Sequence, residues 1–226
     1  MSYILAENLV KQYGGGEATA MAVRGISFEI RSGEFIGIMG ESGSGKSTLL
    51  SMMGDLNTPT SGRYMVDKID VYALAPEQRA DFRREFLGFV FQGFYLLPYL
   101  TVLENVMLPM TTIKMRGKRK RALAEQVLDR VGLAGKASRL PSQISGGEQE
   151  RVSIARAIVN EPLILLADEP TGNLDTKTSR EIMGLFQNLN SDGVTIIMVT
   201  HSPECAQYAQ RILRISDGFL VGASFL

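Results

Sequence analysis

The chain has 226 residues, with 24 Lys plus Arg and 24 Asp plus Glu, so its formal net charge is zero. This length suits one α/β domain with a modest subdomain and excludes two full catalytic domains. The charge balance excludes a general attraction to nucleic acid or to an anionic membrane, so any partner surface must be local.

The sequence also bears on the cellular compartment. No apolar run approaches the roughly 18 to 20 residues that span a bilayer, and Met1 to Ile4 lack the basic and apolar regions of a secretion signal. Cys205 is the single cysteine, so no internal disulfide can form. We expect a cytoplasmic chain in which Cys205 is buried in helix packing.

Apolar runs and helical segments alternate along most of the chain. The expected buried strands are residues 35–39, 86–91, 163–167, 194–199 and 211–215. The expected helices are residues 46–53, 149–159, 178–189 and 203–209, the last with Ser202 as its cap. This alternation predicts a doubly wound α/β fold.

Two regions depart from the alternation. The first 30 residues and residues 63–71 have the pattern of short strands broken by glycine, which predicts a side sheet. Residues 94–160 contain the expected helices 122–131 and 149–159 and no strand pattern. We therefore expect a single domain, 1–226, in which residues 1–93 and 161–226 form the core with a β side sheet and residues 94–160 form an inserted helical subdomain.

Residues 40–47, GESGSGKS, match the phosphate-loop pattern G-x-x-x-x-G-K-[ST] between an apolar strand and a helix. In such loops the backbone N–H groups and the helix N-terminus bind phosphate oxygens, Lys46 reaches the β and γ phosphates, and Ser47 binds Mg²⁺. The residues expected to bind ATP here are Gly40, Glu41, Ser42, Gly43, Ser44, Gly45, Lys46, Ser47 and Thr48.

Polar side chains follow the ends of three expected strands. Asp168 and Glu169 come directly after residues 163–167, at the edge where doubly wound sheets bind ligands. Asp168 is expected to hold Mg²⁺, and Glu169 to polarise the attacking water. His201, the only histidine, follows residues 194–199 and can donate to a γ phosphate. Gln92 follows residues 86–91, and its amide can join Mg²⁺ or the water.

Ser145, Gly146 and Gly147 open the helix that precedes the acidic strand. Unpaired N–H groups at a helix N-terminus bind anions, which suggests a second phosphate-binding element. One nucleotide is then held by two chains. The alternative is a simple helix-capping turn.

Taken together, these residues resemble the nucleotide-binding domain of ATP-binding cassette (ABC) transporters over essentially the whole chain. The resemblance implies that Tyr13 stacks on adenine, although it could also pack on the side sheet. Residues 40–47 are similar to the Walker A loop, Gln92 to the Q-loop, residues 145–149 to the signature motif, and residues 172–175, ending at Asp175, to the D-loop. Glu169 matches the catalytic glutamate and His201 the switch histidine.

The resemblance further implies a head-to-tail dimer that forms on ATP binding. In it Ser145, Gly146, Gly147 and Glu148 of one chain close over the γ phosphate of the other, and Mg²⁺ is bound by Ser47, Gln92 and Asp168. The sequence has Ile144 and Glu148 where the family favours leucine and glutamine. Glu148 and Glu150, both placed in the first turn, are expected to suit the helix dipole. Whether their charge also weakens ATP-driven closure stays open at this point.

Residues 96–106 and 167–175 resemble a bacterial branch that serves lipoprotein release, macrolide or peptide export, and cell division. The branch implies a peripheral ATPase at the cytoplasmic face of the inner membrane. It would drive a separate permease through a groove near residues 92–97. Two alternatives remain: a regulatory module that signals through a membrane partner without transport, and a DNA-repair or translation ATPase. The last needs a long coiled coil or a second cassette, and neither is present.

Residues 114–121 form the one concentrated basic stretch. Such a stretch could meet lipid headgroups or an acidic partner. The sequence favours a solvated loop and helix start, because a second basic cluster and interleaved aromatic residues are both absent. For the same reason no nucleic-acid partner is expected.

Overall fold

The structure is a computed structural model that describes residues 3–14 and 19–225. Residues 1–2 lie outside this range, and the expectation about a secretion signal partly rests on them. Gly15 and Gly16, which follow Tyr13 and Gly14, also lie outside it. No helix in the described part of the chain is long and apolar enough to cross a membrane.

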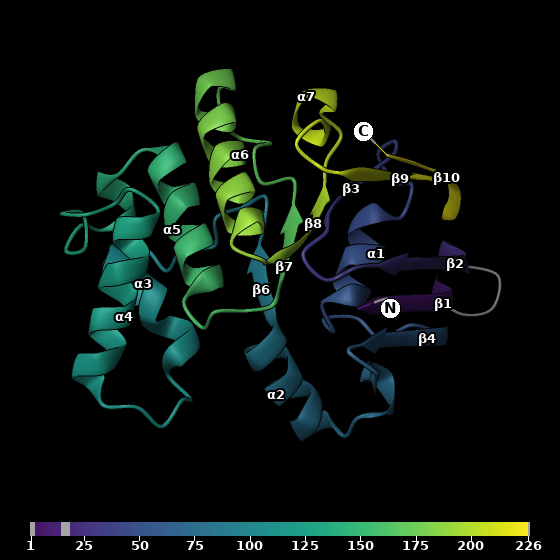
Figure 1. Cartoon of the computed structure of the whole chain (residues 1–226), viewed down its shortest axis with the longest axis horizontal. Helices are drawn as coiled ribbons and strands as arrows, with labels where there is room; N and C mark the ends of the chain where they lie inside the picture. Colours follow the sequence, from purple (N-terminus) through teal and green to yellow (C-terminus); the bar gives the residue numbers. More distant parts are fainter. Residues whose placement is uncertain (1–2, 15–18, 226) are drawn as a thin grey trace.

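The larger sheet has six strands in the order β10-β9-β3-β8-β7-β6 (Figure 1). Its strands are β3 (Phe35–Met39), β6 (Leu87–Val90), β7 (Ile164–Asp168), β8 (Thr195–Val199), β9 (Arg211–Ser216) and β10 (Phe219–Phe225). All neighbours are parallel except β10, which pairs antiparallel with β9. The five expected core strands are therefore present, and β10 is an additional edge strand.

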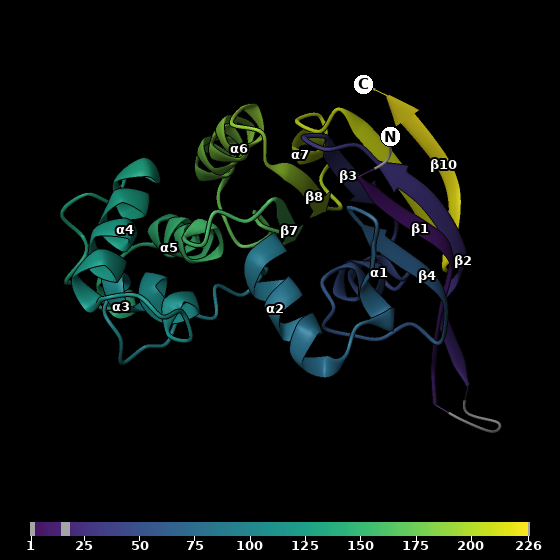
Figure 2. The same cartoon turned by 60° about the horizontal axis from the view of Figure 1, so that its bottom comes forward.

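A separate antiparallel sheet has the order β2-β1-β4-β5. Its strands are β1 (Ile4–Tyr13), β2 (Ala20–Ile30), β4 (Ser61–Val66) and β5 (Ile69–Asp70). Figure 2 shows this side sheet on the opposite side of the molecule from α3 and α4. The expected side sheet is thus present, but β1 and β2 were expected to be short and have 10 and 11 residues.

Helices cover both faces of the larger sheet. They are α1 (Lys46–Met53), α2 (Pro76–Phe86), α3 (Val102–Met107), α4 (Gly117–Arg130), α5 (Gly146–Ile158), α6 (Thr176–Ser191) and α7 (Pro203–Ala206), with short 3₁₀ turns η1 (Val71–Ala73), η2 (Leu108–Met110) and η3 (Pro141–Gln143). Between β6 and β7 the chain forms only α3, η2, α4, η3 and α5, which make the helical unit on the left of Figure 1.

Side chains of each core strand alternate between two apolar cores, as the two-residue period of a strand requires. In β8, Ile196 and Met198 pack with the helical unit and α6, whereas Ile197 and Val199 pack with α1 and the side sheet. All four are fully buried. This burial on both faces explains why the strand is a continuous apolar run.

Several expected boundaries were wrong, each for a local reason. Helix α5 begins at Gly146 and not at residue 149, because Ser145 caps it. Helix α7 ends at Ala206 and not at 209, because the chain then makes i to i+3 turns and the Gln210 N–H bonds to Phe35 in β3. Phe86 belongs to α2 and not to a strand, because its ring stacks on Phe82 one turn earlier.

A buried ion cluster holds α2 against the end of α1. Asp55 is 3% exposed, and its carboxylate pairs with both Arg79 and Arg83 of α2. An unpaired buried carboxylate is strongly unfavourable, so these two arginines are needed to keep Asp55 inside the fold. The cluster thereby places α2 beside β6, where it forms one wall of a groove described below.

Candidate active site

The phosphate loop connects β3 to α1, and its glycines are required by close backbone contacts. A Cβ on Gly40 would lie 2.1 Å from the Ile215 carbonyl oxygen, and one on Gly45 would lie 2.2 Å from that of Ala22. Gly45 also has a left-handed φ of 100° and caps α1 without a side chain. The loop therefore presents bare backbone N–H groups and the positive end of α1 to a ligand.

Lys46 and Ser47 lie at the start of α1 and face the acidic end of β7. Lys46 is 8% exposed, and its ammonium donates to the Glu41 carbonyl oxygen at 2.7 Å, across the loop. The Ser47 hydroxyl bonds to the Asp168 carboxylate at 3.1 Å. Burial raises the pKa of Asp168, while this hydroxyl and Lys46 oppose the rise. Folding thus brings the loop and the acidic strand end into direct contact.

Glu169 and His201 form a pair beside this contact. The His201 Nδ1 lies 2.9 Å from the Glu169 carboxylate, and the His201 backbone N–H donates to the same carboxylate at 3.4 Å. Glu169 has a left-handed φ of 48°, and its N–H bonds to the Val199 carbonyl oxygen. Such a conformation is unusual for glutamate, and the Glu169 carboxylate faces His201, whereas that of Asp168 faces Ser47. The two carboxylates therefore have different surroundings, as expected.

Gln92 is exposed and lies against residues 172–175. The Asn173 amide donates to the Gln92 backbone oxygen at 2.9 Å, and a Cβ on Gly172 would lie 3.0 Å from the Gln92 amide nitrogen. Asp175 caps α6 by accepting from the Lys177 and Thr178 N–H groups, and its hydrogen bonds to Thr178 and Lys177 lower its pKa. The strand-end glutamine and the expected D-loop are thus tied together.

Tyr13 lies at the end of β1, away from the core. Its ring is 42% exposed, the Lys11 ammonium lies 5.1 Å from the ring centre, and its hydroxyl accepts a hydrogen bond from Asn57. An exposed ring face suits stacking on a planar base. The stacking itself remains a prediction.

The turn of Ser145, Gly146 and Gly147 is a capping box at the start of α5. The Ser145 hydroxyl accepts from the Glu148 N–H, and the Glu148 carboxylate accepts from the Ser145 N–H at 2.9 Å. This bond and the nearby Lys136, 3.2 Å away, lower the pKa of Glu148. The Glu148 charge is therefore partly compensated within the chain.

The expected placement of Glu150 in the first turn of the helix was wrong. Glu150 lies in the second turn of α5 with no exposed surface, and neither of its carboxylate oxygens has a hydrogen-bond partner among the described residues. Burial raises the pKa of Glu150 to about 8, against the opposing charge of Arg156. Helix α5 packs against α3, α4, α6 and β6, and this packing covers the Glu150 side chain. It cannot act as a surface charge on closure.

Within one chain, α5 and the phosphate loop are far from each other. Figure 1 shows strands β6 and β7 between α5 and α1. A Cβ on Gly146 would lie 3.9 Å from the side chains of Leu174 and Phe94, and one on Gly147 would lie 2.4 Å from the Thr178 methyl group. The turn therefore adjoins Leu174 and Thr178 of its own chain and lies away from its own phosphate loop.

The donor set near the loop suits Mg²⁺ bound together with a nucleotide. Ser47 and Asp168 are in contact, and Gln92 follows the neighbouring strand β6. No group of three or more His, Cys, Asp or Glu side chains that could hold a metal occurs in the described residues. Oxygen donors with few carboxylates match an ion that takes the rest of its ligands from phosphates and water.

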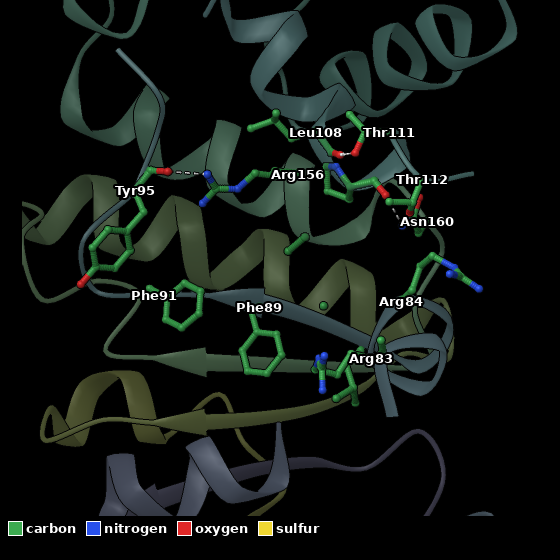
Figure 3. A pocket seen from close by; sticks show the side chains of 15 residues that line it. Arg83, Arg84, Phe89, Phe91, Tyr95, Leu108, Thr111, Thr112, Arg156 and Asn160 are labelled. Atoms are coloured by element: carbon green, nitrogen blue, oxygen red, sulfur yellow. Dashed lines mark hydrogen bonds between the residues drawn. The ribbon is translucent and has the colours of Figure 1, made fainter. Parts of the chain in front are cut away.

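A groove lies between α2, β6, η2 and the end of α5 (Figure 3). Its volume is about 820 Å³, and Phe89, Phe91 and Tyr95 lie along one side. Arg156 donates to the backbone oxygens of Phe94 and Tyr95 and so fixes the segment after Gln92. Of the expected range 92–97 only Tyr95 lines the groove, which extends instead to α2 and η2.

Comparisons with known proteins match this geometry. A family model described as "ABC transporter" matches residues 23–172, about two thirds of the chain. The chain belongs to the ABC transporter family. The ABC fold was correctly predicted, including the antiparallel side sheet and the inserted helices.

Among curated relatives, the macrolide export ATP-binding/permease protein MacB of Syntrophobacter fumaroxidans is 48% identical over 225 residues. The alignment covers 97% of this chain but 31% of that protein, so this ABC chain spans about a third of its length. The uncharacterized ABC transporter ATP-binding protein YvrO of Bacillus subtilis is 48% identical, with 95% of this chain and 93% of YvrO covered.

A solved structure of the bacterial ABC transporter cassette MJ0796 superimposes with a TM-score of 0.91. It is 42% identical, covers 99% of this chain and 98% of that one, and is dimeric. The same cassette was also solved as a dimer in a post-hydrolysis state bound to ADP and Pi. Both MJ0796 structures match nearly the whole length of this ABC chain.

Arg156 and the residues of α2 that line the groove were not predicted from the sequence. A signal for α2 is present in hindsight, since Pro76 at its first position and Gln78 two residues later mark a helix start. No sequence signal identifies Arg156, because its role depends on the backbone oxygens of a loop about 60 residues away in the chain.

Proposed function

We propose that the chain is the ATP-hydrolysing subunit of an ABC transporter. Two copies would dimerise on ATP and drive a membrane permease of the lipoprotein-release or macrolide-export type. The observation that carries this proposal is the Glu169–His201 pair beside the Ser47–Asp168 contact, at the mouth of a phosphate loop that bare glycines build.

Each residue has a distinct task in hydrolysis. Lys46 exchanges the Glu41 carbonyl oxygen for phosphate oxygens when ATP enters the loop. Glu169 accepts the proton of the attacking water, and His201 keeps its second ring nitrogen for the γ phosphate. Ser47, Asp168 and Gln92 would hold Mg²⁺, which neutralises charge on the phosphates.

The second chain completes the site with Ser145, Gly146 and Gly147. Because this turn is remote from the loop of its own chain, a partner's turn is free to cover the γ phosphate. Closure then depends on contacts that exist with ATP and not with ADP, which is how hydrolysis shifts the equilibrium back to the open state. The dimeric MJ0796 structures support this arrangement.

Replacing Glu169 with glutamine tests the assignment of the base. The amide has the shape of the carboxylate but cannot accept the proton, so hydrolysis should fall by a factor of about 10² to 10⁴. ATP binding should persist, and the variant should elute as a dimer with ATP and Mg²⁺. Glu7→Gln, at an exposed position in β1, is the matched control. Hydrolysis at the parental rate in Glu169→Gln would refute the proposal.

The groove is the proposed docking site for the permease, which would place the chain as a peripheral subunit at the cytoplasmic face of the inner membrane. A cleft lined by aromatic rings suits the apolar face of a short partner helix. Tyr95 lines the groove, whereas Tyr99 is 90% exposed and lies outside it. Tyr95→Ala should therefore weaken capture of a permease by the Glu169→Gln chain from native membranes, and Tyr99→Ala should not. Equal loss from both variants would exclude the groove.

A further inference from the structure

Residues 114–121, here called the basic segment, hold six cations and no carboxylate, at Lys114, Arg116, Lys118, Arg119, Lys120 and Arg121. All are exposed except the partly buried Lys120. Arg121 pairs with Glu125 at 2.8 Å, and both side chains are largely solvated. Within the described ranges 3–14 and 19–225, the other five have no ion-pair partner. The segment is thus a local excess of positive charge on a chain whose net charge is zero.

The basic segment also opposes the electrostatics of its own helix. Helix α4 begins at Gly117, so four of its first five residues are cations at the positive end of the helix dipole. It has no acidic residue in its first turn and no side-chain cap, whereas α3 is capped by Thr101, α5 by Ser145 and α6 by Asp175. Helix α1 also has no acidic residue in its first turn and no side-chain cap, and there the bare N-terminus serves the phosphate loop. The departure at α4 likewise suggests that its charge serves a partner outside the chain.

The basic segment adjoins the groove. Thr111 and Thr112 line the groove and closely precede the segment, and the Lys120 ammonium donates to the Thr111 carbonyl oxygen at 3.4 Å. In Figure 1 the start of α4 and helix α2, which forms the opposite wall of the groove, lie on the same lower side of the molecule. A permease helix seated in the groove would therefore turn this side toward the membrane.

We propose that the basic segment binds anionic lipid headgroups beside the permease. This inference rests on the proposed docking of the permease in the groove, which turns the segment toward the bilayer. Several exposed Lys and Arg side chains suit a diffuse layer of negative charge, and each adds roughly fivefold to the partition onto an anionic membrane.

The composition of the segment favours lipid over nucleic acid. No aromatic side chain lies within residues 114–121, so bases have no ring on which to stack. Met115 is partly exposed between Lys114 and Arg116, which suits shallow contact with a headgroup layer.

Binding of the purified chain to lipid vesicles, without any permease, tests the inference. Vesicles of phosphatidylcholine are compared with vesicles of phosphatidylcholine mixed with phosphatidylglycerol, by co-sedimentation at low and high salt. The chain should bind only the anionic vesicles, and salt should weaken binding. The triple variant Lys114→Gln, Lys118→Gln, Arg119→Gln should lose on the order of a hundredfold in partition.

The matched control is Arg31→Gln, Lys68→Gln, Arg214→Gln, which removes the same charge from exposed positions outside the helical unit. It should bind vesicles as the parent does. Three outcomes would overturn the inference: equal binding to both kinds of vesicle, equal loss from both triple variants, or tighter binding to a single-stranded RNA than to anionic vesicles. ATP hydrolysis by both variants should match that of the parent, so failure here leaves the proposed ATPase function intact.

Discussion

Replacing Glu150 with glutamine is expected to change how stability depends on pH. Glu150 has no exposed surface, and neither carboxylate oxygen finds a donor in the described part of the chain. Burial raises its pKa to about 8, compared with 4.5 for a solvated glutamate. The folded chain therefore keeps Glu150 protonated at neutral pH, whereas the unfolded chain ionises it.

The direction of this pH dependence follows from the number of protons that each state binds. Between pH 4.5 and about 8 the folded state binds more protons at Glu150 than the unfolded state does, so stability falls as pH rises. The stabilising contribution is complete below pH 4.5 and is lost by about pH 8. At about 1.4 kcal/mol per pH unit, the loss amounts to roughly 3 kcal/mol at pH 7 and roughly 5 kcal/mol above pH 8. The Glu150→Gln chain would show no such loss, because an amide at this position does not ionise.

Urea unfolding, followed by circular dichroism from about pH 5 to pH 8.5, measures this difference. The free energy of unfolding of Glu150→Gln minus that of the parent should increase with pH and level off above about pH 8. The control is Glu148→Gln, because the pKa of Glu148 is lowered from 4.5 and its contribution is lost only as pH falls below that value. Its difference from the parent should therefore stay constant over the measured range.

A constant difference between Glu150→Gln and the parent across this range would refute the reasoning. It would mean that Glu150 ionises normally in the folded chain, and that Arg156 compensates its charge in full. The measured slope thus distinguishes a neutral buried carboxyl from a buried ion pair.

Three further substitutions test other parts of the structure. Asp55→Asn should lower the free energy of unfolding by about 3 to 5 kcal/mol, because two arginines lose their charged partner. A loss no larger than that caused by Asp81→Asn, at an exposed position, would contradict this. Gly147→Ala should reduce ATP hydrolysis because its Cβ meets the Thr178 methyl group. Adding Thr178→Ser removes that methyl group and should restore the rate; if it does not, the defect has another cause. Tyr13→Ala should weaken ATP binding by about 1 kcal/mol, measured by calorimetry, while Tyr13→Phe should not.

Much of the candidate site could be predicted because its determinants are local. The phosphate loop needs glycines between a strand and a helix, and Ser145 and Glu148 form a capping box within four residues. Strand ends at Asp168, Gln92 and His201 could be inferred to share one edge, because parallel strands of a doubly wound sheet present the same ends.

Other features depend on contacts between distant segments, which periodicity cannot reveal. The sequence places Glu150 in the first turn of a helix, where a charge is normally solvated, yet the packing of α5 buries it. The groove needs α2, and α2 is held by the pairing of Asp55 with arginines more than 20 residues away.

The sequence by itself therefore determined the nucleotide chemistry, since adjacent residues supply the loop, the caps and the strand ends. Only the tertiary structure decided which charges are buried and which are exposed. It buries Glu150 and leaves residues 114–121 in solvent beside the groove, because burial is a property of how helices pack and not of the residues that they carry.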